Sequence, residues 1–161
     1  SKTPDKITDS VIPMNNSNQQ VNSTIDKVIA IYENLSAKSI DQLHELYTED
    51  VYFEDPAHAI QGIKALKKYY EKLFNNVQLC QFRFHTSICE EDKLFLCWTM
   101  TLQHKHLNGG KRILVEGASL LKTRDDKVFY HRDYFDLGNM LYENIPLLGS
   151  LVRRAKKGLS T

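Results

Sequence analysis

Hydrophobic residues recur with a helical period in three early segments of the chain. A first helix is predicted from Ser23, where Ser23 and Asp26 have the spacing of a capping box, and a second from Ser39 up to the acidic pair Glu49-Asp50. A third helix is predicted over residues 62–75, with its lysines facing water. The residues that these periods place inward include Ile25, Val28, Ile29, Tyr32, Leu35, Ile40, Leu43, Leu46, Ile63, Leu66, Tyr70, Leu73 and Phe74.

Between the second and third helices the period of the apolar positions changes to two. Val51, Phe53 and Asp55 then share one side of a strand, and Pro56 ends it because proline has no N–H to donate to a ladder. Asp55 is therefore expected at the end of a strand, facing the core.

The second half of the chain has the pattern of a sheet. Strands are predicted over residues 77–90, 93–106, 111–123 and 127–136, separated by turn-forming acidic or glycine-rich segments. Consecutive strands joined by such short turns must pair antiparallel. Helical spacing resumes at Leu137 and is interrupted at Pro146. This order of elements predicts an α+β domain whose helices cover one face of the sheet.

The alternation within the strands groups several side chains that can do chemistry. On the last strand, His131, Asp133 and Phe135 share one face, opposite Tyr130 and Arg132. If that face is the interior, it encloses a histidine and a carboxylate together with Asp55. Buried ionisable groups are costly, so the grouping indicates a functional site, the alternative being a ladder of surface salt bridges.

Composition narrows the function classes. The chain has 161 residues, with 21 Lys and Arg against 20 Asp and Glu, a net charge of +1 that provides no diffuse field to attract nucleic acid. No apolar run reaches the roughly 20 residues of a membrane span, so a cytoplasmic protein is expected. Residues 1–22 are polar without a period and are expected to form a flexible tail, leaving residues 23–157 as a single domain.

Metal and cysteine chemistry are not expected. Cys80, Cys89 and Cys97 have no CxxC spacing and fall in apolar segments, which is typical of reduced core residues. His104 and His106 share a strand face, but the sequence offers no third ligand beside them, so neither metal nor cofactor is predicted.

The basic end of the chain, residues 153–157, follows an apolar helix face. It is expected to close the domain or pack in a dimer, with docking on an acidic lipid surface or another partner as the alternative.

Two stretches carry a family resemblance. IAIYENLSAKSIDQLHELYTEDVYFEDPAHAIQGIKALKKYYEKLF and the closing HRDYFDLGNML resemble the nuclear transport factor 2-like superfamily, which includes SnoaL-like polyketide cyclases, ketosteroid isomerases and limonene epoxide hydrolases. The resemblance covers about residues 24–155. It implies a cone-shaped roll, in which a strongly curved, mostly antiparallel sheet wraps around N-terminal helices with a C-terminal helix. It also implies an apolar pocket on the concave face, to which it assigns His131, Asp133 and Phe135, and a homodimer.

The resemblance to the ketosteroid isomerases assigns catalytic roles to two residues. Asp55 matches their general base, and Tyr32 matches their oxyanion-hole tyrosine with one residue of slack. Their third key residue, an aspartic acid that stays protonated, falls on Ala118, with Glu116 two residues away on the same strand face. This departure argues against steroid-type isomerisation.

The resemblance to the epoxide hydrolases is closest in the C-terminal half. Asp133 matches their water-activating aspartate, but Trp98 and Met100 replace the arginine and the second aspartate of the triad. Phe53 and Asp55 replace the tyrosine and asparagine that hold the water. The triad is thus incomplete, which argues against epoxide hydrolysis by that route.

These assignments combine into one functional hypothesis. A small, largely apolar ligand is expected in a pocket where Asp55, with His131 and Asp133 or Tyr32, supports acid/base chemistry of the isomerase, cyclase or hydrolase type. The alternative is a non-catalytic ligand-binding or protein-interaction module on the same fold. The expected binding residues are Phe53, Trp98, Met100, Glu116, Ala118 and Phe135.

Overall fold

The computed structural model describes residues 16–141 and 148–159. In chain order its elements are α1 (Asn16–Glu33), a 3₁₀ turn (Ile40–Gln42), α2 (Leu43–Leu46), β1 (Tyr47–Glu54), β2 (Ala59–Gln61), α3 (Ile63–Asn76), β3 (Val77–Glu90), β4 (Lys93–His104), a second 3₁₀ turn (Asn108–Gly110), β5 (Ile113–Arg124), β6 (Lys127–Phe135), α4 (Leu137–Met140) and α5 (Leu148–Gly158).

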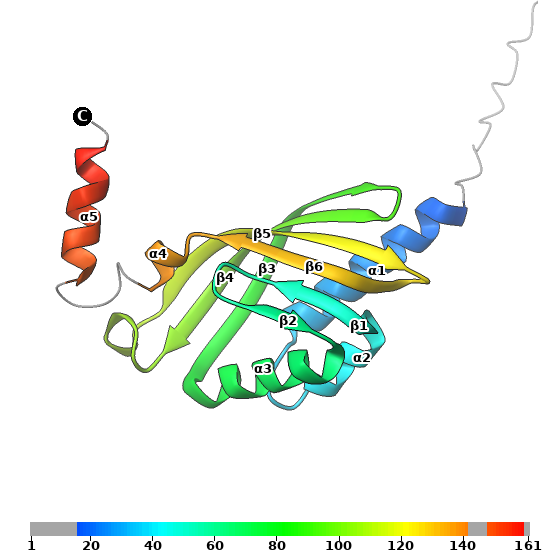
Figure 1. Cartoon of the computed structure of the whole chain (residues 1–161), viewed down its shortest axis with the longest axis horizontal. Coiled ribbons are helices and arrows are strands. Elements are labelled where there is room, and N and C mark those ends of the chain that lie inside the picture. Colours follow the sequence, from blue (N-terminus) through cyan, green and yellow to red (C-terminus); the bar gives the residue numbers. More distant parts are fainter. Residues whose placement is uncertain (1–15, 142–147, 160–161) are drawn as a thin grey trace, which may run out of the picture.

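The strands form one curved sheet with the order β2-β1-β6-β5-β4-β3. The hairpins from β3 to β6 pair antiparallel as predicted, whereas β1 joins the sheet parallel to β6. The sheet does not close into a barrel, and helices α1 and α3 pack against β3 and β1 respectively (Figure 1). The predicted α+β roll, with a curved sheet around N-terminal helices and a C-terminal helix, is confirmed.

Alternation along β4 separates an inner face from an outer face of the sheet. Leu96, Trp98, Met100 and Leu102 are buried on the inner face. The main core lies between α1, α3 and the sheet, and a second cluster around Trp98 extends along β4 and β5 to Leu107. The inner face therefore carries both the core and the candidate site.

The boundaries of the early elements differ from the sequence-based prediction. Helix α1 begins at Asn16 and runs through Ser23, so residues 16–22 are helical and only 1–15 of the predicted tail lie outside the described residues. No glycine or proline interrupts that segment, so its sequence contains no strong helix breaker. The second helix ends at Leu46, and Tyr47 starts β1.

The short strand β2 was not predicted. Its residues Ala59–Gln61 pair antiparallel with the end of β1, and three residues are too few for a recognisable period.

Helix α5 stands apart from the sheet in Figure 1 and carries the basic residues of the C-terminal segment. Lys156 on α5 forms an ion pair of 3.1 Å with Asp136, the residue that caps α4. None of the helices in the described part of the chain combines the length and apolar character needed to cross a lipid bilayer.

Candidate functional site

The register of the central strands places the candidate residues on the inner face of the sheet. Ser119 on β5 pairs with Leu96 on β4 and with Asp133 on β6, so their side chains point to the same side. His131 pairs with Leu121 and is buried on the same face. The interior assignment of the face that carries His131, Asp133 and Phe135 therefore agrees with the structure.

Glu116 and Ala118 do not line the site, which corrects the sequence-based expectation. They pair with Thr99 and Cys97, residues of the outer face of β4, and Glu116 is exposed. The physical reason is the strand period of two, since Gly117 and Ser119 between and beside them occupy the inner positions.

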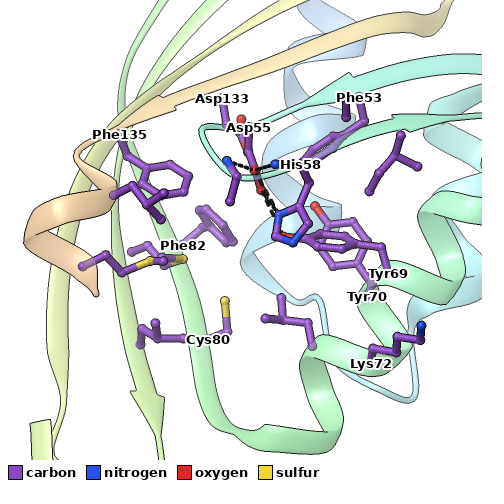
Figure 2. A pocket seen from close by; sticks show the side chains of 18 of the residues that line it. Phe53, Asp55, His58, Tyr69, Tyr70, Lys72, Cys80, Phe82, Asp133 and Phe135 are labelled. Carbon is purple, nitrogen blue, oxygen red and sulfur yellow. Dashed lines mark hydrogen bonds and ion pairs between the residues drawn. The ribbon is translucent and has the colours of Figure 1, made fainter. Parts of the chain in front are cut away.

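A cavity of about 920 Å³ opens between the inner face of the sheet and α3 (Figure 2). The predicted apolar residues Phe53, Trp98, Met100 and Phe135 all line it. Asp55 and Asp133 lie on its wall, whereas Tyr32 and His131 border only a much smaller void behind Trp98 and Asp133. The structure thus brings the two carboxylates, but not all four predicted catalytic residues, to one cavity.

Asp133 is held by two donors on a single oxygen. Its Oδ1 accepts a hydrogen bond of 2.5 Å from the Ser119 hydroxyl and lies 2.6 Å from Nε2 of His131. Ser119 in turn accepts a hydrogen bond of 2.8 Å from the indole N–H of Trp98. Within the described residues, Oδ2 of Asp133 has no hydrogen-bond partner, so it is the oxygen available to a ligand.

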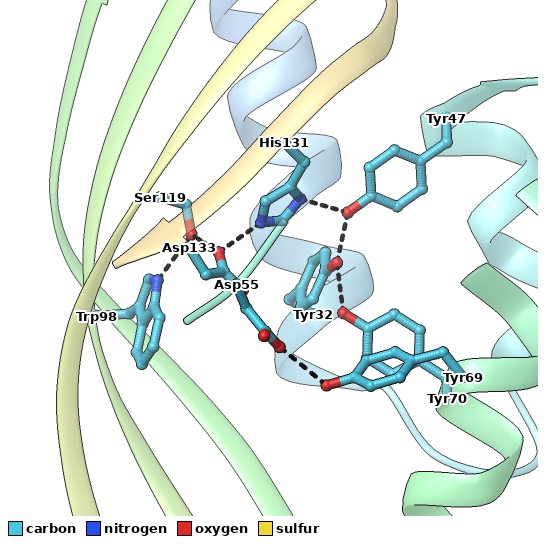
Figure 3. Close-up of polar contacts among 9 residues, drawn as sticks. All are labelled: Tyr32, Tyr47, Asp55, Tyr69, Tyr70, Trp98, Ser119, His131 and Asp133. Atoms are coloured by element: carbon cyan, nitrogen blue, oxygen red, sulfur yellow. Dashed lines mark hydrogen bonds and ion pairs between the residues drawn. The ribbon is translucent and has the colours of Figure 1, made fainter. Parts of the chain in front are cut away.

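A chain of hydroxyl groups extends from His131 into the core (Figure 3). The Tyr47 hydroxyl lies 2.6 Å from Nδ1 of His131 and is hydrogen-bonded to the Tyr32 hydroxyl, which lies 2.9 Å from that of Tyr70. Burial, the largest cause, raises the pKa of all three tyrosines well above the ordinary value. These hydroxyls therefore stay protonated near neutral pH.

The donor and acceptor roles along this chain of hydrogen bonds depend on each other. An imidazole with its hydrogen on Nε2 donates to Asp133, and its Nδ1 then accepts from Tyr47. Tyr47 must accept from Tyr32, and Tyr32 from Tyr70, so each donor points toward Asp133. The opposite tautomer would set the Nε2 lone pair of His131 against a carboxylate oxygen. With an uncharged imidazole, the network therefore places the ring hydrogen on Nε2, next to Oδ1 of Asp133.

Asp55 has a different environment, in which both oxygens already have partners. Its Oδ1 accepts the backbone N–H groups of Ala57 at 2.8 Å and His58 at 2.7 Å. Its Oδ2 accepts the Tyr69 hydroxyl at 3.1 Å, and the His58 ring lies beside the carboxylate. This is the geometry of an Asx turn, which stabilises the reversal from β1 to β2.

Several residues of the network were missed in the sequence. Ser119 lies in an apolar strand, and Tyr47 lies where helix was predicted, so neither carried a signal. Tyr70 was predicted to face inward, but periodicity does not indicate which partner a buried hydroxyl will find. The strand register, which brings Ser119 opposite Asp133, was the one signal that could have found that residue.

The predicted histidine pair does not assemble a metal site in the described residues. The ring centroids of His104 and His106 are 5.6 Å apart. No cluster of three or more metal-ligating side chains occurs among the described residues. Cys80 is partly buried on the cavity wall and Cys89 is exposed.

This combination of a curved, open sheet, covering helices and a cavity on the inner face defines the nuclear transport factor 2-like class of fold. The sequence model of the SnoaL-like domain matches residues 28–131, which is more than half of the chain. The chain therefore belongs to the SnoaL-like domain family. A search of curated protein sequences gave no significant match.

Solved structures with the same fold are distant in sequence. A protein of ketosteroid isomerase-like fold from Catenulispora acidiphila, solved with trimethylamine, is 16% identical with a TM-score of 0.66, over 76% of this chain and 93% of its own. A protein assigned as a SnoaL-like polyketide cyclase from Jannaschia sp. CCS1 is 18% identical with a TM-score of 0.63, over 72% and 87% of the two chains.

A third similar structure is an LEH-like epoxide hydrolase from M. tuberculosis. It is 16% identical with a TM-score of 0.63, over 84% of this chain and 97% of its own. At these identities the similarity shows the fold alone.

Proposed function

We propose that this protein binds a small, largely apolar ligand in the inner cavity and transfers a proton to and from it through Asp133. The observation that carries the proposal is the difference in hydrogen bonding between the two oxygens of Asp133. Two donors occupy Oδ1, and no described residue occupies Oδ2. A carboxylate held in this way on an apolar wall is oriented to act as a general base.

The surroundings of Asp133 support the same role. Its side chain is only 11% exposed, so few water molecules compete with a ligand for Oδ2. The Nε2–H of His131 and the hydroxyl of Ser119 keep Oδ1 occupied when Oδ2 takes up a proton. Returning that proton to a second atom of the ligand completes an isomerisation or a ring closure.

Asp55 is assigned a structural role in this proposal. Two backbone N–H groups occupy its Oδ1 and the Tyr69 hydroxyl occupies its Oδ2, so a proton abstracted by Oδ2 would have to displace the Tyr69 hydroxyl. Asp133 therefore replaces Asp55 as the proposed base. Hydrolysis of the epoxide type is not supported, because the indole of Trp98 and the thioether of Met100 line the cavity at the positions of the absent triad members.

Solvent deuterium exchange tests this proposal directly. A panel of apolar cyclic ketones is incubated with the protein in D₂O, and deuterium incorporation beside the carbonyl is followed by mass spectrometry. We expect exchange with wild type and at least a hundredfold loss in Asp133→Asn, whereas Asp55→Asn retains exchange if it still folds. If the neutral fluorophore N-phenyl-1-naphthylamine binds but no ketone exchanges faster with wild type than with Asp133→Asn, the protein is a non-catalytic binding module.

We also propose that two copies associate through the outer face of the sheet. Leu114, Phe95, Tyr134 and Ile88 are large apolar side chains exposed on that face. Exposed apolar groups gathered on one face are typical of a protein interface. Light scattering after size exclusion is expected to give a dimer for wild type and a monomer for Leu114→Lys; a monomeric wild type would contradict this proposal.

A further inference from the structure

The cavity has cationic side chains where its wall meets solvent. Lys68 and Lys72, here called the rim lysines, line it from α3, and His104 lines it from the end of β4. Both lysines are exposed and lie one helical turn apart, so they lie on one side of α3. The rim therefore presents positive charge beside an apolar interior.

The rim lysines lack the acidic partner that a neighbouring lysine has. Lys67 forms an ion pair of 3.1 Å with Asp41. In the described residues, no carboxylate forms an ion pair with Lys68 or Lys72, although both border the cavity. Their charges are therefore available to a group that enters from solvent.

His104 lies on the β4 side of the rim, next to other basic residues. Its ring lies beside Lys105 and His106, and no acidic group contributes to its titration. Desolvation first, and then the neighbouring His106 and Lys105, lower the pKa of His104. The ring of His104 is therefore uncharged near neutral pH, and the positive charge of the rim comes from Lys68 and Lys72.

The carboxylates lie at the opposite side of the cavity from Lys72 (Figure 2). An anionic group placed beside Asp133 and Asp55 would be repelled, whereas a neutral hydroxyl or carbonyl would not. A ligand that carries one negative charge is thus oriented, with the charge at the rim and its neutral, reactive part at Asp133.

We infer that the ligand class of this cavity is an organic anion with an apolar body, such as a hydrophobic carboxylic acid, whose charged group is held by Lys68 and Lys72. This inference rests on the proposed function, because it specifies the ligand of the same cavity. Two lysines act as point charges and do not require one anion geometry, so they suit a single carboxylate on ligands of different shape. The rim also attracts such anions from solution.

Two fluorescent probes with similar apolar bodies but different charge show how much the charge contributes to binding. Anilinonaphthalene sulfonate is an apolar anion, and N-phenyl-1-naphthylamine has a closely similar body without the charge. We expect Lys68→Gln and Lys72→Gln each to weaken binding of the anion about threefold and the double variant about tenfold. Binding of the neutral probe is expected to stay unchanged, and displacement of one probe by the other places both in the same cavity.

Lys64→Gln is the control, because Lys64 is exposed on the same helix but does not line the cavity. Raising the salt concentration from about 50 mM to 500 mM should weaken only the anionic probe. The inference is overturned if the neutral probe binds and the double variant leaves the anion unaffected, or if Lys64→Gln has an equal effect. If neither probe binds, both the proposed function and this inference are contradicted.

Discussion

Tyr47 and His131 are 84 positions apart in the chain, yet the Tyr47 hydroxyl lies 2.6 Å from Nδ1 of the His131 ring. Both side chains are almost fully buried, so no water can replace this contact. The contact holds the ring of His131 in place, and the other ring nitrogen, Nε2, then faces Asp133. A residue at the start of β1 thus helps to position the histidine that contacts the proposed base on β6.

Replacing Tyr47 by Phe tests this relationship. The variant leaves Nδ1 of His131 without a buried partner and removes one of the two partners of the Tyr32 hydroxyl, which is expected to cost about 1–3 kcal/mol of unfolding free energy in urea titrations. Tyr134→Phe, on the exposed outer face, is the control and should change stability by less than about 0.5 kcal/mol. Equal midpoints for Tyr47→Phe and wild type would show that the hydroxyl chain contributes nothing to stability.

Gly117 is expected to tolerate no side chain, because the ring of Trp98 occupies the space beside it. A Cβ added at Gly117 would come within 2.4 Å of the indole. Gly117→Val should therefore displace the ring, weaken its hydrogen bond to Ser119 and cost about 1–3 kcal/mol. Trp98 is the single tryptophan, so its emission reports the displacement. Ala118→Ser, on the outer face, should leave the spectrum unchanged; an unshifted spectrum in Gly117→Val would contradict the packing.

Local periodicity was sufficient for most of the fold. The four long strands were predicted to within a few residues because their alternation is regular and their turns are distinct. The parallel pairing of β1 with β6 could not be predicted in this way, because it joins segments far apart in sequence and depends on the packing of the whole sheet. The start of α1 was misplaced because Ser23 and Asp26 have the spacing of a capping box although they lie inside the helix.

The candidate site was predictable only in part, for a related reason. Alternation placed His131 and Asp133 on one face of the last strand, since grouping by face needs only the period of a strand. It did not show that Ser119 and His131 share one oxygen of Asp133, or that Asp55 caps a turn. Such partner choices depend on distances between elements, which a sequence pattern does not contain.

The thiols should differ sharply in their reaction with iodoacetamide at pH 8. Burial raises the pKa of Cys80 to about 12, so on the order of 10⁻⁴ of it is thiolate at that pH. Cys89 is exposed and is expected to be alkylated completely before Cys80 reacts, as measured by peptide mass spectrometry. In denaturant both should react at the same rate. Comparable rates for the two thiols in the folded protein would contradict the burial of Cys80.

Stability should fall at alkaline pH because of the buried tyrosines. Desolvation is the largest cause that raises the pKa of Tyr32, Tyr47, Tyr69 and Tyr70 above the ordinary value of about 10, so above that pH the unfolded chain loses protons that the folded chain keeps.

The unfolded state then binds fewer protons, and the unfolding free energy decreases as pH rises, by up to about 1.4 kcal/mol per pH unit for each such group. Below about pH 10 these groups contribute no slope. Urea titrations from pH 8 to pH 11.5 should therefore show a steep loss only above pH 10, and Tyr32→Phe should be less stable at pH 8 but have a shallower alkaline slope. Tyr134→Phe should keep the slope of wild type. A slope unchanged in Tyr32→Phe would mean that this hydroxyl ionises as readily in the folded protein as in the unfolded chain.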